Sequence, residues 1–189
     1  MQDGKAVQLL LNGEEHGHGH VVEKLLKRAE RLECLVAFAK ISAIGDLLKP
    51  LRKALEGGLK ARFAIGLDFY LTEPEALRQL FALAEKHALV LYLSNASDTF
   101  HPKIYAFQNG KQCSVIVGSA NLTHGGFYGN YEASALIDDA SGALMASVTR
   151  HLDALVADRI LVPATKPRID AYGRECIIHA TCRKVARQR

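Results

Sequence analysis

Residues 101–134 read HPKIYAFQNGKQCSVIVGSANLTHGGFYGNYEAS, and this stretch decides the fold. Runs of β-branched, aromatic and apolar residues at 102–107 and 114–117 lie on either side of Asn109-Gly110. Asn-Gly is among the strongest signals for a tight turn between antiparallel strands. We therefore expect a β-hairpin here, followed by a further strand at 131–137.

Outward from the hairpin, short apolar runs alternate with longer amphipathic segments, which is typical of a sheet covered by helices. Further strands are expected at residues 6–11, 34–39, 60–66 and 89–93, and helices at residues 21–32, 41–55, 72–87 and 141–155. Gly57-Gly58 suits the end of the second helix, and Pro74 suits the start of the third. The sequence predicts an α/β fold with a mixed β-sheet flanked by helices.

The composition is that of an ordinary globular protein: 189 residues, 49% hydrophobic and 23% charged, enough for one well-cored domain. No run approaches the roughly 18 apolar residues of a membrane span, and the first residues do not resemble a secretion signal. A cytoplasmic location is therefore the expectation. Four scattered cysteines are expected to be reduced thiols, namely Cys34, Cys113, Cys176 and Cys182.

Basic residues concentrate at the C-terminus. Residues 166–189 carry seven lysines and arginines against two acidic residues, whereas residues 1–165 are close to neutral. We divide the chain accordingly into a catalytic domain, 1–165, and a basic C-terminal segment, 166–189. Such a segment indicates either a polyanionic partner or a solvated tail.

Polar residues at strand ends form the candidate site. The strand period of two places His101 and Lys103 on one face, where an imidazole beside an ammonium suits an anion. Ser119 and Asn121 follow the apolar strand 114–117, and Glu132 comes eleven residues after Asn121. Taken singly, each has an ordinary explanation as a packed, capping or solvated side chain. Their combination is far less common.

The combination resembles the hallmark of the phospholipase D superfamily: His-x-Lys, Gly-Ser-x-Asn and an acidic residue on the next strand. Here these are His101-Pro102-Lys103, Gly118-Ser119-Ala120-Asn121 and Glu132. The surrounding residues are similar to the nuclease branch, including metal-independent restriction endonucleases. One departure is Gln108, where the full motif has Asp. Since the chain has a single motif, the resemblance implies a phospholipase D-like half-domain that pairs as a homodimer.

The resemblance also implies a mechanism without metal or cofactor. His101 would be the nucleophile that forms a phosphohistidine, and Glu132 would accept a hydrogen bond from its other ring nitrogen. Lys103 and Asn121 would hold the non-bridging phosphate oxygens, with Ser119 supporting the pocket. The second imidazole, needed to protonate the leaving group, would be His101 of the other subunit.

DNA is the favoured substrate because the C-terminal segment is basic and no membrane-binding helix is evident. Candidate substrate-binding residues are Gly118, Asp68 after the third strand together with Tyr70, and the glycines Gly125, Gly126 and Gly129, although a merely flexible loop would look the same. Either cleavage has no strict sequence preference, or a partner supplies the recognition, for which a helicase or methyltransferase of a restriction system is a candidate. The alternatives are a phosphodiesterase or phosphatidyltransferase acting on lipid or small diesters, and a non-catalytic nucleic-acid-binding dimer.

Two histidine-containing clusters lie outside this motif. His16, His18 and His20 could present imidazoles to a metal, but their flanking glycines favour a mobile loop. Cys176, His179 and Cys182 have helical spacing and offer three ligands, whereas a structural zinc site uses four. We expect no metal at either cluster.

Overall fold

The computed structural model describes residues 6–12, 17–95 and 97–187, with side chains described up to residue 184. Within these ranges eight strands form one sheet in the order β1-β7-β6-β5-β2-β3-β4-β8. The strands are β1 (Ala6–Leu11), β2 (Arg31–Val36), β3 (Lys60–Ile65), β4 (Leu89–Ser94), β5 (Lys103–Asn109), β6 (Gln112–Gly118), β7 (Ala133–Asp139) and β8 (Leu161–Pro163). The helices are α1 (His18–Leu26), α2 (Ile41–Glu56), α3 (Pro74–Ala84), α4 (Ala143–Ala157) and α5 (Lys166–Arg187), with short turns η1 (Asp68–Tyr70) and η2 (Gly125–Gly129).

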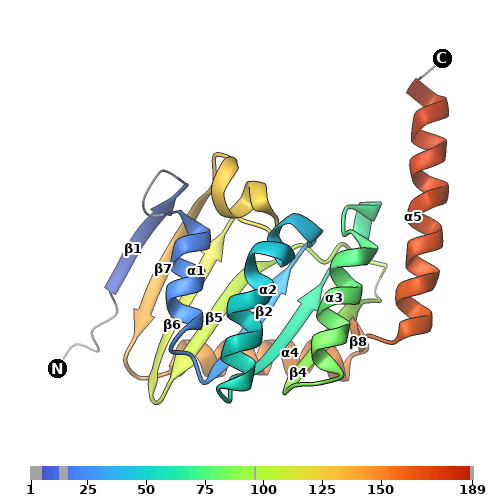
Figure 1. The fold of residues 1–189 in the computed structure, drawn as a ribbon. Helices are drawn as coiled ribbons and strands as arrows, with labels where there is room; N and C mark the ends of the chain where they lie inside the picture. Colours follow the sequence, from blue (N-terminus) through green and yellow to red (C-terminus); the bar gives the residue numbers. More distant parts are fainter. Residues whose placement is uncertain (1–5, 13–16, 96, 188–189) are drawn as a thin grey trace.

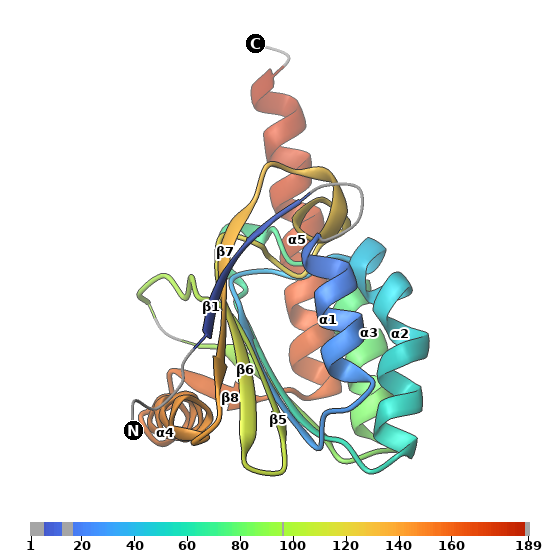
Figure 2. The same cartoon turned by 90° about the vertical axis from the view of Figure 1, so that its left-hand side faces the viewer.

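Helices cover the two faces of the sheet unequally (Figures 1 and 2). On one face lie α1, α2 and α3, and on the other lies α4. The spacing of Ile44, Leu47, Leu51 and Leu55 puts one buried stripe of α2 against the sheet. The mixed sheet flanked by helices confirms the expected α/β fold.

The pairing of the strands brings the functionally interesting segments to one edge of the sheet. Strands β2, β3 and β4 are parallel and end together, whereas β5, β6 and β7 pair antiparallel. Val36 is opposite Lys103, Ile104 is opposite Val117, and Gly118 is opposite Ser134. The ends of β2, β3, β4 and β6 and the starts of β5 and β7 therefore share one edge, which we call the site edge.

The hairpin is confirmed, although its turn differs by one residue from the expectation. Asn109 pairs with Gln112, so the two loop residues are Gly110 and Lys111. Gly110 has a φ of 57°, which glycine adopts at little cost.

The expected helix 21–32 was wrong at both ends. Helix α1 starts at His18 and ends at Leu26, and residues 31–36 form β2. Charged residues such as Glu33 are usually exposed, yet the Glu33 side chain is fully buried in β2. Arg62 Nε lies 2.8 Å from Glu33 Oε2, and this ion pair compensates the buried carboxylate.

The basic C-terminal segment is a helix of 22 residues, α5, reached through the short strand β8, which the sequence analysis missed. Ile169 and Tyr172 in its first part are buried in the main core. Its later part extends past the site edge, as both views show (Figures 1 and 2). The first part is therefore not a solvated tail.

All four cysteines are free, and Cys34 and Cys113 are buried. Burial raises the pKa of the Cys34 thiol, which makes it an unreactive core residue. No helix in the described part of the chain has the length and apolar character needed to cross a membrane.

Candidate active site

His101 and Lys103 lie together at the start of β5. Lys103 Nζ is 2.8 Å from Nδ1 and 3.1 Å from Nε2 of the His101 ring, and it donates to the His101 carbonyl at 3.2 Å. The ammonium therefore lies close to both nitrogens of the exposed His101 ring, and an anionic ester could contact the two groups together.

The environment of Lys103 is partly apolar and partly acidic. Burial lowers the pKa of the Lys103 ammonium, while attraction to the nearby Glu132 carboxylate acts in the opposite direction and is the smaller effect. A partly desolvated cation interacts more strongly with a phosphate oxygen than a fully hydrated one does.

Ser119 and Glu132 form the opposite wall of the site. The Ser119 hydroxyl donates to Glu132 Oε2, and Asn130 Nδ2 donates to Glu132 Oε1 at 3.2 Å. The Ala133 amide donates to Ser119 Oγ at 3.0 Å. Ser119 and Glu132 are held together because Gly118 is opposite Ser134 in the sheet, so the residues just beyond each strand are neighbours.

The expected hydrogen bond from His101 to Glu132 is not among the contacts of the described residues. The Glu132 carboxylate accepts hydrogen bonds from Ser119 and Asn130 instead. The same carboxylate is also close enough to Lys103, on the His101 side of the site, to attract that ammonium electrostatically.

Asn121 lies between β6 and η2 with its side chain oriented by the backbone. The Phe38 amide donates to Asn121 Oδ1 at 3.4 Å. Since the oxygen faces Phe38, the two N–H donors of the amide are on the other side of the group. The amide can therefore act as a hydrogen-bond donor, as the proposed contact with a phosphate oxygen needs.

The glycines around the site are explained by close packing. A Cβ on Gly118 would lie 2.3 Å from Ser134 Oγ, and a Cβ on Gly126 would lie 2.4 Å from the Asn121 carbonyl oxygen. Gly126 is buried and Gly125 packs on Asn130, so these two residues support the loop from inside. The expectation that they let a DNA backbone approach is corrected for the buried Gly126.

A buried hydrogen-bond network supports this loop from α1. Asn12 Nδ2 donates to the carbonyls of Gly126 and Asn130, both at 3.0 Å. Asn12 Oδ1 is 2.7 Å from His18 Nδ1, and His18 Nε2 is 2.7 Å from Ser134 Oγ. The network thus connects η2, α1 and the strand that packs against Gly118.

The protonation of His18 follows from these partners. The Asn12 side-chain nitrogen donates to two backbone carbonyls, so the Asn12 side-chain oxygen is the atom that faces His18. This oxygen can only accept, and His18 Nδ1 must therefore be the donor. His18 Nε2 then has a lone pair and accepts from the Ser134 hydroxyl. Burial lowers the pKa of His18, although the Glu132 carboxylate opposes this. The ring is therefore a neutral structural group.

The proposed mobile histidine loop is corrected for His18, which is buried in α1, while His16 lies outside the described residues. Helical spacing with Val22 and Leu25, both buried, was the signal that could have placed His18 in the helix. In the described ranges, no group of three or more His, Cys, Asp or Glu side chains is arranged to hold a metal ion.

Asp68 lies in η1, at the carboxyl end of β3, and is tied to the active-site strand. Its Oδ2 accepts a hydrogen bond of 3.2 Å from the amide of Phe100, the residue before His101. Phe69 and Tyr70 have φ values of 59° and 55°, which cost about 1–2 kcal/mol per residue for L-amino acids. Gln108, in contrast, lies near the other end of β5, so this departure from the motif removes no group from the site edge.

Comparisons with known proteins identify the family and the fold. A family profile described as "Cardiolipin synthase, PLD-like domain" matches residues 2–156. The structure of Nuc, a phospholipase D family member from Salmonella typhimurium, superposes with a TM-score of 0.66 at 18% identity, covering 86% of this chain and 100% of that one. NucT from Helicobacter pylori gives a TM-score of 0.61 at 14% identity, covering 85% and 100%.

A larger protein shares the same fold. Phosphatidylserine synthase from Haemophilus influenzae Rd KW20 gives a TM-score of 0.69 at 16% identity, covering 99% of this chain and 46% of that one. No curated protein matches the sequence significantly. At these identities the solved structures establish the fold, whereas the profile establishes the family.

Proposed function

The chain belongs to the phospholipase D superfamily of phosphodiesterases, and we propose that it hydrolyses DNA without a metal through a phosphohistidine at His101. The observation that carries the proposal is the 2.8 Å contact between Lys103 Nζ and a His101 ring nitrogen. It places the candidate nucleophilic imidazole beside a cation that can hold a phosphate oxygen. Asn121 and Ser119 come from the adjacent strand end and would add contacts to an anionic diester.

The reaction would proceed in two displacements at phosphorus. The lone pair of a His101 nitrogen attacks phosphorus, and the bond to the leaving oxygen breaks as that oxygen takes a proton. Water then attacks the phosphohistidine, loses its proton to a base, and releases a phosphomonoester. Lys103 and Asn121 stabilise the charge on the non-bridging oxygens in both steps.

The proton donor of the first step and the base of the second would be the partner's His101. Each chain carries one His-x-Lys motif, so two chains related by a two-fold axis would supply the two imidazoles. The two rings would then titrate as a coupled pair.

An exposed apolar surface on the α4 face of the sheet is available for this pairing. Val7, Leu9 and Leu11 of β1 are 68%, 66% and 54% exposed, and Val117 is 40% exposed. Leu9 is opposite Ala135, and Ala135 is opposite Val117, so these side chains share one face of the sheet. We call them the apolar stripe. Contiguous exposed apolar surface is typical of protein interfaces.

A long polyanion fits the surroundings better than a small diester does. Helix α5 carries the exposed basic residues Arg174, Arg183 and Lys184. Its later part extends past the site edge (Figure 1). These charges would add salt-dependent phosphate contacts away from the reacting phosphate. Sequence preference would come from a partner such as a helicase or methyltransferase.

The experiment is cleavage of plasmid DNA in EDTA by the intact protein and two variants. We expect nicking to persist in chelator and to be lost in His101→Ala. The matched control His151→Ala changes an exposed histidine on α4, on the other face of the sheet, and should cleave normally.

Other results would overturn the proposal in distinguishable ways. Inhibition of cleavage by EDTA would contradict the metal-independent mechanism. Turnover of lipid diesters without DNA cleavage would identify a lipid-directed enzyme, and DNA retention by the intact protein without turnover would identify a binding protein.

A further inference from the structure

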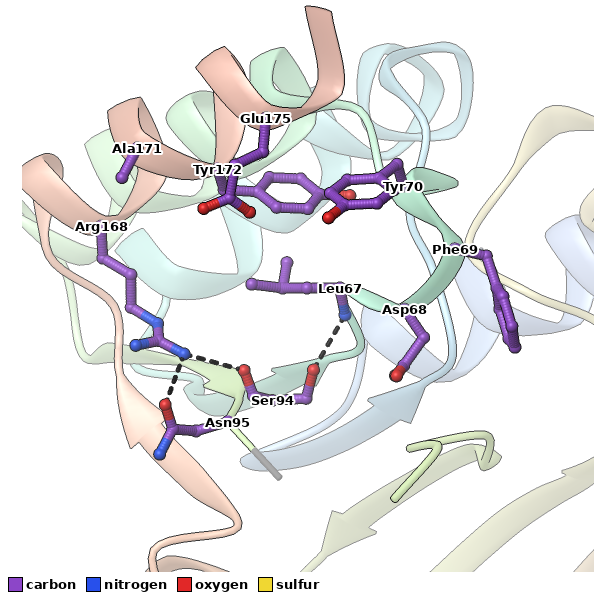
Figure 3. Close-up of a pocket in the computed structure, with 10 residues that line it drawn as sticks. All are labelled: Leu67, Asp68, Phe69, Tyr70, Ser94, Asn95, Arg168, Ala171, Tyr172 and Glu175. Atoms are coloured by element: carbon purple, nitrogen blue, oxygen red, sulfur yellow. Dashed lines mark hydrogen bonds between the residues drawn. The ribbon is translucent and has the colours of Figure 1, made fainter. Parts of the chain in front are cut away.

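A cavity of about 470 Å³ opens at the site edge, between the ends of β3 and β4 and the first part of α5 (Figure 3). This volume falls within the range of small-molecule sites. The cavity is independent of the residues assigned to the reaction. Its α5 side, which includes Arg168 and Tyr172, lies beyond the residues that match the family profile.

The cavity is connected to the catalytic strand through Asp68. This side chain lines the cavity and accepts the 3.2 Å hydrogen bond from Phe100, next to His101. A substrate whose phosphate is held by His101 and Lys103 would therefore have its adjoining group beside the cavity.

One wall of the cavity is aromatic. The rings of Tyr70 and Tyr172 are nearly parallel, at 13°, with centroids 6.1 Å apart. They lie along one side and face Leu67, with Arg168 and Asp68 at opposite ends (Figure 3). The Tyr172 hydroxyl donates to the Thr72 carbonyl at 2.9 Å, which holds the Tyr172 ring in place. A rigid aromatic wall favours a flat aromatic ligand.

The charges of the cavity select against a phosphate. Asp68 and Glu175 contribute two carboxylates against the single guanidinium of Arg168. Arg168 Nη2 already donates to the Ser94 carbonyl at 3.0 Å and to Asn95 Oδ1 at 2.9 Å. Uncompensated carboxylates repel anions and accept hydrogen bonds from amino groups. The fitting ligand is a flat, neutral ring with N–H donors.

We propose that this cavity binds an unpaired nucleobase next to the phosphate that is cleaved at His101. The inference rests on the proposed nuclease function and narrows its substrate to single-stranded or locally opened DNA. A base inside a duplex is stacked on its neighbours and uses its N–H donors for pairing, so it cannot enter the cavity. Adenine, cytosine and guanine carry an exocyclic amino group that could donate a hydrogen bond to these carboxylates.

The test fills the cavity while leaving the reacting groups intact. Ala171 lines the cavity, so Ala171→Trp places an indole inside it. The matched control, Ile177→Trp, places the same ring on an exposed position of the same helix, 69% exposed and outside the cavity. Tyr70→Ala removes part of the aromatic wall, and Tyr70→Phe retains it.

We expect Ala171→Trp and Tyr70→Ala to raise KM for a single-stranded oligonucleotide about 10-fold, in line with the effect of losing one base stack. Cleavage of an abasic single strand of the same length, which has no aromatic ring beside its phosphates, should not distinguish Ala171→Trp from the wild-type protein. Circular dichroism spectra like that of the wild type would report that all four variants are folded. Ile177→Trp and Tyr70→Phe should resemble the wild-type protein. Duplex DNA should have a higher KM than the single strand.

Binding of the same oligonucleotide, followed by fluorescence anisotropy, separates this inference from the nuclease proposal. If the protein cleaves the oligonucleotide and Ala171→Trp leaves KM unchanged, the nuclease proposal stands and the proposed base site is wrong. If Ala171→Trp weakens binding about 10-fold but the wild-type protein does not cleave, the proposed base site stands and the nuclease proposal is wrong.

Discussion

Replacing His18 by leucine tests the network that supports the active-site loop. The imidazole connects Asn12 Oδ1 and Ser134 Oγ, at 2.7 Å each, and it is almost completely buried. Leucine fills similar space but offers no hydrogen bond. The Ser134 hydroxyl then loses its acceptor, the His18 ring nitrogen. This hydroxyl packs against Gly118, which has no side chain.

The expected loss of stability in His18→Leu follows from the hydrogen-bond partners that the substitution removes. Asn12 Oδ1 retains the backbone amide of residue 18 at 3.2 Å, so only the Ser134 hydroxyl is left without its partner. An unsatisfied buried hydroxyl costs about 1–3 kcal/mol, and the lost hydrogen bond to Asn12 adds about 1 kcal/mol. We expect His18→Leu to lower the free energy of unfolding by about 2–4 kcal/mol near neutral pH.

The difference in the free energy of unfolding between the wild-type protein and His18→Leu should depend on pH. Burial lowers the pKa of His18 in the folded protein, whereas an unfolded chain protonates histidine near pH 6.5. As pH falls below about 6.5, the unfolded wild-type chain binds a proton that the folded protein resists, so wild-type stability decreases. One histidine contributes at most about 1.4 kcal/mol per pH unit, and this contribution ends below the folded pKa.

Urea denaturation at pH 7.5 and 5.5 measures both effects. The stability gap between wild type and His18→Leu should narrow at the lower pH, because leucine does not titrate. His20→Leu, at an exposed position of the same helix, should change stability by less than about 0.5 kcal/mol. An equal gap at both pH values would refute the neutral, buried assignment of His18.

Three further predictions concern the site and its support. Lys103→Met should reduce kcat for DNA cleavage about 10²- to 10³-fold with unchanged folding, because a donor to the phosphate oxygens is lost; a near-normal kcat would remove Lys103 from the mechanism. Gly126→Ala should lower activity about 10²-fold, because its Cβ would lie 2.4 Å from the Asn121 carbonyl and displace Asn121; wild-type kinetics would show that the loop adapts. Arg62→Met should lower the free energy of unfolding by about 3 kcal/mol, since it removes a partner of the buried Glu33; thermal denaturation that is unchanged from wild type would contradict this.

The sequence was most informative where local chemistry and tertiary structure agree. The hairpin at 103–118 could be predicted because its apolar runs and its turn residue indicate the same structure. The convergence of His101, Ser119 and Glu132 follows from antiparallel pairing, which brings alternate strand ends to one edge.

The sequence was least informative where a polar residue is buried with a distant partner. Glu33 has one partner near in sequence, Arg31, but its second partner, Arg62, is distant. His18 likewise has Asn12 near in sequence, but its second partner, Ser134, is distant. The cavity beside Asp68 is a similar case, because Arg168 and Tyr172 reach it from a helix about a hundred residues further along the chain. A basic C-terminal segment gives no indication of which of its residues pack inward.

The most direct test of the account is isolation of the covalent intermediate. The intact protein is mixed with labelled single-stranded DNA, quenched within the first turnover in alkali, and digested for mass spectrometry. The account predicts a phosphoryl adduct on His101 that is stable in base and lost in acid. Product formation with no adduct on His101, or an adduct on a different residue, would contradict it.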